Sequence, residues 1–287
     1  MAPPATDSGR VKAQLAKARA TLATAGIPLP WLDAEILVAH VLKSSRERLH
    51  SHPDRQLTVA QRAQLRRLTS RRAARVPVPY LVGEREFYGH MFRVTPGVLI
   101  PRPSSELLVE LAIDWLKAHP DAQRVIDLGT GSGAVAISVA KAVPDVRIEA
   151  RDVSARALRV ADDNIARHRL RRRITTVRAD LLRGAAPADV ILANLPYIPD
   201  ALRRVRPKEL DYEPALALDG GKDGLDLIRI ALSQAPAAVE PGGLVLFECD
   251  PAQTRRVARL ALGHWPASDV SVHKDLAGQD RVVRVQT

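Results

Sequence analysis

The sequence predicts an α/β protein in which a small helical domain precedes a doubly wound, mostly parallel sheet. From residue 124 onward, short apolar runs of strand length alternate with stretches of helical periodicity. This alternation is typical of a parallel sheet with helices on both faces. Before residue 86, apolar residues recur at helical spacing. The chain of 287 residues is long enough for two such domains.

We expect three segments along the chain. Residues 1–85 should form the helical domain, residues 86–100 a β-hairpin linker, and residues 101–287 the sheet domain. The hairpin is predicted because residues 86–94 alternate between apolar and polar side chains. The prolines at positions 101 and 103 then mark the crossing into the sheet domain.

Three helices are predicted in the first segment. Apolar residues recur at helical spacing from Leu15 to Ala25, over residues 31–42 and over residues 58–72. Thr58 is expected to cap the third helix, because its hydroxyl can accept from a free backbone N–H of the first turn. The prolines at positions 77 and 79 should end the helical pattern.

The sheet domain should contain six strands and at least three helices. The predicted strands are Arg124–Leu128, Val146–Arg151, Ile174–Val177, Val190–Ala193, Leu244–Glu248 and Val282–Val285. The predicted helices are Gly133–Val143, Ala155–His168 and Asp223–Ala235.

Charge is distributed unevenly between the two domains. The net charge is +11, and residues 1–85 hold 15 Lys and Arg against 6 Asp and Glu, whereas residues 86–287 hold 28 against 26. A basic appendage on a near-neutral body indicates either an acidic or polyanionic partner or a solvated, arginine-rich helical face. Aromatic residues are only 3% of the chain, which disfavours base-stacking platforms for nucleic acid.

Composition excludes several classes of protein. No apolar run approaches the roughly 18 residues of a membrane helix, and residues 1–8 lack the features of a secretory signal. We therefore expect a soluble, cytoplasmic protein with no membrane partner. Cys249 is the only cysteine, which excludes an intrachain disulfide, and the eight histidines do not cluster, so we expect no metal site.

A glycine turn follows the first predicted strand of the sheet. Gly129, Gly131 and Gly133 allow the backbone to turn sharply and to approach a ligand closely. Asp152 lies 23 residues after Gly129, at the end of the next predicted strand, where a carboxylate can accept hydrogen bonds from two ribose hydroxyls. This Rossmann-like pattern predicts a nucleoside site, for either a nicotinamide dinucleotide or a methyl-donor nucleoside.

The run Asn194-Leu-Pro-Tyr197 favours the methyl donor. It follows the fourth predicted strand, where an open α/β sheet places its reacting groups. The Asn194 Oδ1 atom and a main-chain carbonyl of the turn can each accept one N–H of an amide, while Pro196 and Tyr197 offer a flat apolar surface. Positioning of this kind supplies much of the catalysis without a strong general base.

Two runs carry a resemblance to a known class of enzyme: Asp127-Leu-Gly-Thr-Gly-Ser-Gly133 and Asn194-Leu-Pro-Tyr197. They resemble class I S-adenosylmethionine (SAM)-dependent methyltransferases of the Asn-Pro-Pro-Tyr type. Further runs narrow the resemblance to the HemK-type peptide chain release factor glutamine methyltransferases, over nearly the whole chain. These runs are Phe87-Tyr-Gly89, Leu99-Ile-Pro-Arg-Pro103 with Glu106, Tyr212-Glu-Pro-Ala-Leu216, Gly220-Gly-Lys-Asp-Gly224 and Asp275-Leu-Ala-Gly-Gln-Asp-Arg281.

The resemblance implies transfer of a methyl group from SAM to the side-chain amide of the glutamine in a release factor's Gly-Gly-Gln loop, with the basic helical domain helping to hold that protein. The cofactor residues that it implies, together with the glycine turn, are Asp127, Gly129, Thr130, Gly131, Gly133, Asp152, Asp180 and Asn194. The implied catalytic and substrate-binding residues are Asn194, Leu195, Pro196 and Tyr197, with Arg102 and Glu106 also binding substrate.

The sequence departs from the family pattern at three places. Leu195 stands where the family has the first proline of Asn-Pro-Pro-Tyr, which bears on the rigidity of the loop. Ser104-Ser105 replaces an acidic residue and a threonine, which bears on the pocket for the methionine end of SAM. Cys249-Asp250 replaces Ile-Gly after Glu248, which bears on strand packing.

Two other functions remain open at this point. A basic N-methyltransferase of this type could act on an exocyclic base amine of RNA or DNA, because adenine N6 presents a similar planar N–H₂ group. The departures also allow a SAM-binding, ribosome-associated paralogue without catalysis. Nucleic acid is therefore a possible partner, but the few aromatic residues and the runs at 99–106 and 275–281 favour a protein substrate.

Overall fold

The computed structural model describes residues 9–202 and 205–287 and divides into two compact units. The helical unit holds the described residues up to Gly83 together with Lys208–Tyr212. The sheet unit holds the described residues of Glu84–Pro207 and Glu213–Thr287. The contacts therefore divide the chain after Gly83, and the hairpin that the sequence treats as a linker packs within the sheet unit.

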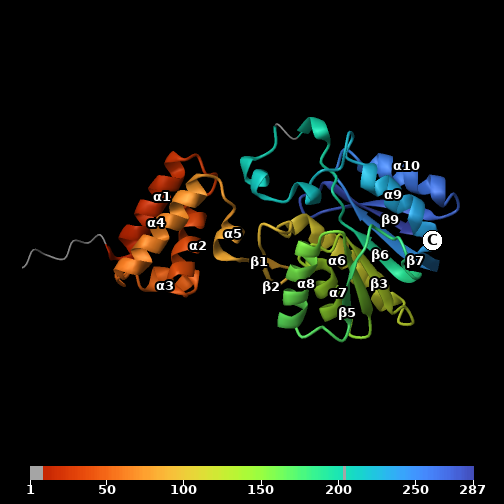
Figure 1. Ribbon diagram of the computed structural model, residues 1–287, viewed down its shortest axis with the longest axis horizontal. Coiled ribbons are helices and arrows are strands. Elements are labelled where there is room, and N and C mark those ends of the chain that lie inside the picture. The colour runs from red at the N-terminus through yellow and green to blue at the C-terminus, as the bar shows by residue number, and fades with distance from the viewer. Residues whose placement is uncertain (1–8, 203–204) are drawn as a thin grey trace, which may run out of the picture. The chain divides into compact units, whose positions relative to one another are not determined.

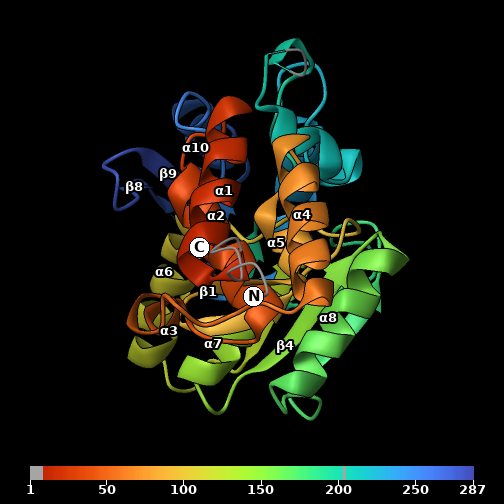
Figure 2. The same ribbon diagram turned by 90° about the vertical axis from the view of Figure 1, so that its left-hand side faces the viewer.

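The helical unit is built mainly from three helices that pack side by side, α1, α2 and α4 (Figures 1 and 2). Its α-helices are α1 (Val11–Thr24), α2 (Pro30–Leu42), α3 (Arg46–Ser51), α4 (Val59–Ala73) and α5 (Val78–Val82), and it also contains the 3₁₀ turn η4 (Lys208–Tyr212). The expected cap of α4 is confirmed. Thr58 Oγ1 accepts from the Gln61 backbone N–H at 3.2 Å, and Gln61 Oε1 accepts from the Thr58 N–H at 2.9 Å.

The short helix α5 contradicts the prediction that prolines end the helical pattern at residues 77–79. Pro77 precedes α5, and Pro79 lies in its first turn, where a missing N–H costs no helical hydrogen bond. Gly83 then ends the helix in the left-handed conformation, with a φ of 86°. The two prolines therefore start a helix at this point.

The sheet unit contains nine strands and five α-helices within the described residues. The strands are β1 (Glu84–Phe87), β2 (His90–Arg93), β3 (Arg124–Leu128), β4 (Arg147–Asp152), β5 (Ile174–Arg178), β6 (Ala188–Ala193), β7 (Val239–Glu248), β8 (Asp269–Lys274) and β9 (Asp280–Gln286). The α-helices are α6 (Glu106–Ala118), α7 (Ala134–Ala142), α8 (Ala155–Arg167), α9 (Asp226–Gln234) and α10 (Thr254–His264). Shorter 3₁₀ turns are η2 (Pro103–Ser105), η3 (Asp200–Leu202), η5 (Ala215–Ala217) and η6 (Ala235–Ala237).

The main sheet has seven strands in the order β5-β4-β3-β6-β7-β9-β8. The first five are parallel, and β9 pairs antiparallel with both β7 and β8. Helices α6, α7 and α8 cover one face, and α9 and α10 cover the other (Figure 1). Figure 2 shows α8 running alongside β4. The predicted doubly wound, mostly parallel fold is confirmed.

Alternate residues of the central strands β3, β6 and β7 enter two separate cores. In β7, Leu244 and Leu246 pack on the α6–α7–α8 face, whereas Val245 and Phe247 pack on the α9–α10 face. Because both faces are buried, these strands consist of nearly continuous apolar residues, which made them visible in the sequence. The β1–β2 hairpin joins the first core through Phe87 and Phe92, whose rings meet edge to face at 6.2 Å.

Three elements of the sheet unit are absent from the sequence prediction: α6, α10 and β8. The strand β8 lies at the edge of the sheet and is half-buried along most of its length, so it lacks a continuous apolar run. Within the residues that the structure describes, no helix is both long and apolar enough to span a membrane.

Candidate active site

The candidate site lies at the carboxyl edge of the parallel strands. The strand register pairs Leu128 of β3 with Ala193 of β6, and Ala193 with Phe247 of β7. The residues that follow these three positions therefore leave the sheet side by side. This edge is where open α/β sheets hold their ligands.

The glycine turn after β3 has the conformation that its sequence predicts. Gly129 and Gly131 have φ values of 68° and 57°, in the left-handed region that favours glycine. A Cβ on Gly129 would lie 3.3 Å from Leu195 Cδ2 and 3.4 Å from the Asn194 carbonyl oxygen. The turn and the loop after β6 therefore approach so closely that a side chain at position 129 would push them apart.

Two carboxyl groups fix this turn, the buried Asp127 and the partly buried Asp152. Asp127 accepts from the Thr130 hydroxyl at 2.7 Å, and burial raises the pKa of Asp127 to about 7. Asp152 Oδ2 accepts from the Gly131 backbone N–H at 3.0 Å, and its Oδ1 accepts from the Ser154 N–H at 2.8 Å. Burial also raises the pKa of Asp152, against the lowering effect of these backbone donors.

A cavity of about 250 Å³ adjoins the turn and brings together most of the predicted cofactor residues. Its walls are largely apolar. Among the predicted residues, those that line it are Gly129, Gly131, Asp152, Asp180, Asn194, Leu195 and Pro196. A flat nucleoside fits such a cavity, because apolar walls can hold the base while a carboxylate accepts from the ribose hydroxyls.

A smaller cavity of about 50 Å³ shares several lining residues with the first. Asn194, Gly129 and Gly131 line both cavities. The smaller one is also lined by the predicted residues Arg102, Asp127 and Thr130, and by Ser105. Asn194 therefore lies where the two cavities adjoin, which is the position required of a residue between a methyl donor and its acceptor.

Three predicted residues do not line either cavity. Gly133 is the N-cap residue of α7, and a Cβ there would lie 3.4 Å from the Cβ of Ala161 on α8. Tyr197 packs against the α9–α10 core, and burial raises its pKa. Glu106 Oε1 accepts from the Tyr88 backbone N–H at 3.0 Å, which ties α6 to the hairpin. Their roles toward ligands remain predictions.

Arg102 meets a partner that the sequence analysis did not single out. Its guanidinium pairs with the carboxylate of Glu213, whose side chain is only 1% exposed. Glu213 Oε2 also accepts from the Ile100 backbone N–H at 3.0 Å. Two runs that carry the resemblance, Leu99–Pro103 and Tyr212–Leu216, are thus joined through Glu213.

Asn194 and its loop are held by two side chains whose role the sequence analysis missed. Asn194 Nδ2 donates to Ser105 Oγ at 2.8 Å. Gln253 Nε2 donates to the carbonyl oxygens of Tyr197, at 2.9 Å, and Asp223, at 3.2 Å. Because both contacts join segments far apart in the chain, no local sequence pattern pointed to either of them.

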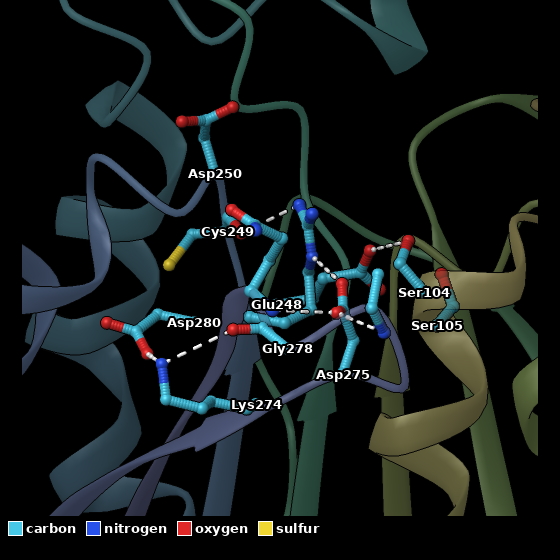
Figure 3. A network of polar contacts seen from close by, with 12 residues as sticks. Ser104, Ser105, Glu248, Cys249, Asp250, Lys274, Asp275, Gly278 and Asp280 are labelled. Carbon is cyan, nitrogen blue, oxygen red and sulfur yellow. Dashed lines mark hydrogen bonds and ion pairs between the residues drawn. The ribbon is translucent and has the colours of Figure 1, made fainter.

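A network of polar contacts lies around the end of β7 (Figure 3). Glu248 is fully buried, and its Oε1 accepts from Ser104 Oγ at 3.0 Å. Arg281 donates to Asp275 at 3.2 Å and to the Cys249 carbonyl oxygen at 3.4 Å. Burial raises the pKa of the Cys249 thiol to about 12, so this cysteine is no nucleophile at neutral pH.

The sheet order, the glycine turn with Asp152 on the neighbouring strand, and Asn194 between two cavities together define a class I methyltransferase. Two family models match the chain: the PrmC N-terminal domain over residues 13–83 and the methyltransferase small domain over residues 103–205. A 16S rRNA methyltransferase of T. thermophilus, solved with AdoMet and guanosine, shares this fold at a TM-score of 0.52 and 18% identity, covering 71% of this chain and 49% of its own.

Curated relatives place the chain more closely. It is 38% identical to the release factor glutamine methyltransferase of Moorella thermoacetica, over 93% of this chain and 95% of that one. It is 41% identical to the enzyme of the same name from Bordetella pertussis, over 88% and 94% of the two chains. A solved protein-(glutamine-N5) methyltransferase from Alicyclobacillus acidocaldarius is 35% identical, covers 68% of this chain and 98% of its own, and has a TM-score of 0.42. The chain belongs to the release factor glutamine methyltransferase family, and its methyl donor is SAM.

Proposed function

We propose that this enzyme methylates the side-chain amide nitrogen of the glutamine in the Gly-Gly-Gln loop of peptide chain release factors. The observation that carries the proposal is the 38% identity to a release factor glutamine methyltransferase over 93% of this chain. The position of Asn194 at the junction of the two cavities supports the same function. Relatives of this kind favour a protein amide as the substrate over the exocyclic base amine of RNA or DNA that the sequence also allowed.

The chain's own residues would hold the cofactor by shape and by hydrogen bonds. SAM supplies an electrophilic methyl group when it is bound. Asp152 would accept from the ribose hydroxyls, while its bonds to Gly131 and Ser154 keep the carboxylate in place. Gly129 and Gly131 would leave the backbone open to close approach, and Asp180 lies on the cavity wall for the adenine side.

The loop after β6 would orient the substrate amide. An amide nitrogen is a poor nucleophile because its lone pair is delocalised into the carbonyl. The Asn194 Oδ1 atom and the Leu195 carbonyl oxygen would each accept one of its N–H groups, which aligns the nitrogen with the methyl group. Arg102, on the wall of the smaller cavity, would contact the incoming loop. Positioned acceptors of this kind stabilise the charge that develops on the nitrogen during transfer.

The basic helical unit would help to dock the release factor. Arg66, Arg67 and Arg71 are exposed along α4. Arg72 and Arg75 are instead occupied within the helical unit by Glu209, at 3.1 and 3.4 Å. The exposed arginines are therefore the ones available to an acidic surface of the substrate.

Mass spectrometry of the Gly-Gly-Gln peptide tests the proposal directly. Purified release factor and transfer RNA would be incubated together with this enzyme and labelled SAM. We expect a single methyl group on the glutamine and no label in the RNA. Asn194→Ala provides the matched control, since it should methylate the release factor far more slowly under the same conditions. Label that appears only in RNA would overturn the proposal.

A further inference from the structure

We propose that Glu248 is a positioning residue that sets the orientation of the Asn194 side-chain amide through the hydroxyl of Ser105. The inference rests on the proposed function, because it explains how Asn194 presents an acceptor to the substrate amide. In this relay, Asn194 Nδ2 donates to Ser105 Oγ, and the Ser105 hydroxyl donates to Glu248. The Asn194 Oδ1 atom then faces the substrate.

The relay answers a problem that any asparagine in this role must meet. An asparagine side chain has a donor end and an acceptor end of nearly the same shape. Only the orientation with Oδ1 toward the substrate can accept its N–H, whereas the flipped orientation would point a donor at a donor. Asn194 Nδ2 lies 2.8 Å from Ser105 Oγ, which is the useful orientation.

A serine hydroxyl alone cannot hold that orientation, because it can either donate or accept. If Ser105 gave its proton to Asn194, the amide would flip. A neighbouring group that only accepts removes this freedom by taking the serine proton. An ionised carboxylate is such a group, since it has no proton to donate.

Glu248 has the location and the environment for this task. It ends β7, beside β6, whose last residue Ala193 precedes Asn194, and Figure 3 shows Ser104 and Ser105 lying next to it. Its Oε1 accepts from Ser104 Oγ at 3.0 Å. Its Oε2 is buried and has no hydrogen-bond partner among the described residues, so it is free to accept from Ser105. A buried carboxylate oxygen without a donor is costly, which favours that bond.

The charged groups around Glu248 bear on its ionisation. Burial is the largest effect and raises its pKa, and the charge of Asp275 raises it further, while the adjacent hydroxyls of Ser105 and Ser104 and the charge of Arg281 lower it. Because burial outweighs the lowering effects, the pKa of Glu248 lies above its ordinary value, so the carboxylate that the relay requires takes up a proton at a higher pH than an exposed glutamate would. Tyr197 and Cys249 also face this carboxylate, and its charge raises the pKa of both.

The test uses Glu248→Gln and Ser105→Ala in the full-length enzyme, assayed on release factor at saturating SAM. Glutamine has nearly the shape of glutamate but can donate, so Ser105 loses its fixed direction. We expect kcat to fall about 10- to 100-fold in each variant, with SAM affinity changed by less than about twofold. Ser105→Thr keeps the hydroxyl and should restore most of the activity lost in Ser105→Ala. Asp280→Asn, which alters a contact with Lys274 away from Asn194, is the matched control and should match wild type.

Two further readouts separate positioning from general damage to the fold. Because the two residues act in series, the double variant Glu248→Gln/Ser105→Ala should be no slower than Ser105→Ala alone. The wild-type kcat should also fall toward acid pH as Glu248 takes up a proton, whereas Glu248→Gln should lack this fall. If the fold decreases in kcat of the two single variants multiply in the double variant, the relay is wrong. A near-wild-type kcat in Glu248→Gln would also overturn it.

A spectroscopic measurement keeps this inference separate from the proposed function. The side-chain N–H₂ signal of Asn194 can be assigned by its loss in Asn194→Ser. In wild type, one of these protons should be protected from exchange, and both Glu248→Gln and Ser105→Ala should remove the protection. If release factor is not methylated but the protection follows this pattern, the relay stands and the proposed substrate fails. Unchanged protection in both variants overturns the relay whatever the substrate.

Discussion

Arg102 and Glu213 form an ion pair across 111 residues of sequence, and this pair joins two segments that border the cavities. Arg102 lines the smaller cavity, and Pro214, next to Glu213, lines the larger one. Glu213 also accepts from the Ile100 backbone N–H. One buried carboxylate therefore holds both the segment Leu99–Pro103, which lies between β2 and α6, and the loop that follows β6. The walls of the two cavities are therefore mechanically linked.

Glu213→Gln should destabilise the enzyme. The substitution removes the charge that Arg102 faces, and the Arg102 side chain is only 33% exposed. We expect the free energy of unfolding to fall by about 1–3 kcal/mol, measured by urea denaturation. Asp163→Asn, which breaks an exposed pair with Arg93, is the control and should cost less than about 1 kcal/mol. An equal loss of unfolding free energy in the two variants would show that the burial of Glu213 adds nothing to the stabilisation by its ion pair.

Asp127 should make the stability depend on pH. Its folded pKa is raised by burial to about 7 from the ordinary 3.8, so the folded state binds this proton more tightly than the unfolded state. The stability that it contributes is therefore fully present below pH 3.8 and is lost as the pH rises through about 7. Asp127→Asn should show a smaller fall in unfolding free energy between pH 5 and 8. If the unfolding free energies of wild type and Asp127→Asn change in parallel with pH, this expectation is wrong.

Asp152→Ala should weaken the binding of SAM by roughly 1.5–3 kcal/mol, as expected for the loss of hydrogen bonds to a charged acceptor. Calorimetry on the purified variant measures this change. Asp152→Asn retains one acceptor for the Gly131 N–H and should lose less SAM-binding free energy than Asp152→Ala. Comparing the two variants separates the support that Asp152 gives to the turn from its contact with the ribose. Unchanged affinity in Asp152→Ala would mean that the ribose is held elsewhere.

Asn194→Ala and Leu195→Pro should have very different effects on methyl transfer. The alanine removes an acceptor that nothing else replaces and should lower kcat by ~10²-fold or more. Proline at position 195 keeps the backbone carbonyl and stiffens the loop, so kcat should stay within about tenfold of wild type. Both variants would be assayed on release factor at saturating SAM, with SAM affinity as the control. Near-wild-type activity in Asn194→Ala would refute the mechanism.

Reversing the charges of Arg66, Arg67 and Arg71 together should raise KM for the release factor and leave SAM affinity unchanged. These side chains are exposed, so the loss should act on docking rather than on chemistry. The effect should shrink at high salt, because screening weakens interactions between exposed charges. If a short Gly-Gly-Gln peptide is methylated as efficiently as the whole factor, the helical unit has no docking role.

The local sequence pattern was sufficient to predict the central strands and the residues at their carboxyl ends. Residues such as Val190 and Leu244 are buried between two helical layers, so their strands are apolar throughout and stand out in the sequence. Gly129 directly follows such a strand, and Asp152 is the last residue of the neighbouring strand β4, so both were identified from where the strands end. The edge strand β8 has one face toward solvent and no comparable run, and it was missed.

Residues that act through long-range contacts were not visible in local pattern. Ser105 and Asn194 are 89 residues apart, and nothing near either one indicates the other. The same holds for Gln253 and the Tyr197 carbonyl oxygen, 56 residues apart. Such pairs are created by strand register, which brings the ends of distant strands to one edge, so only the fold can reveal them.

The segment Lys208–Tyr212 has a consequence for how this architecture can be divided. It belongs to the helical unit, where Glu209 pairs with Arg72 and the Tyr212 hydroxyl donates to the Ala74 carbonyl oxygen at 2.6 Å. The polypeptide thus enters the helical unit twice, and a single cut after Gly83 does not release that unit intact. Deleting or exchanging residues 1–83 in the gene would leave this segment without Arg72 and the Ala74 carbonyl oxygen, its partners in the helical unit. In evolution, a new N-terminal domain would have to arrive with matching changes about 125 residues downstream.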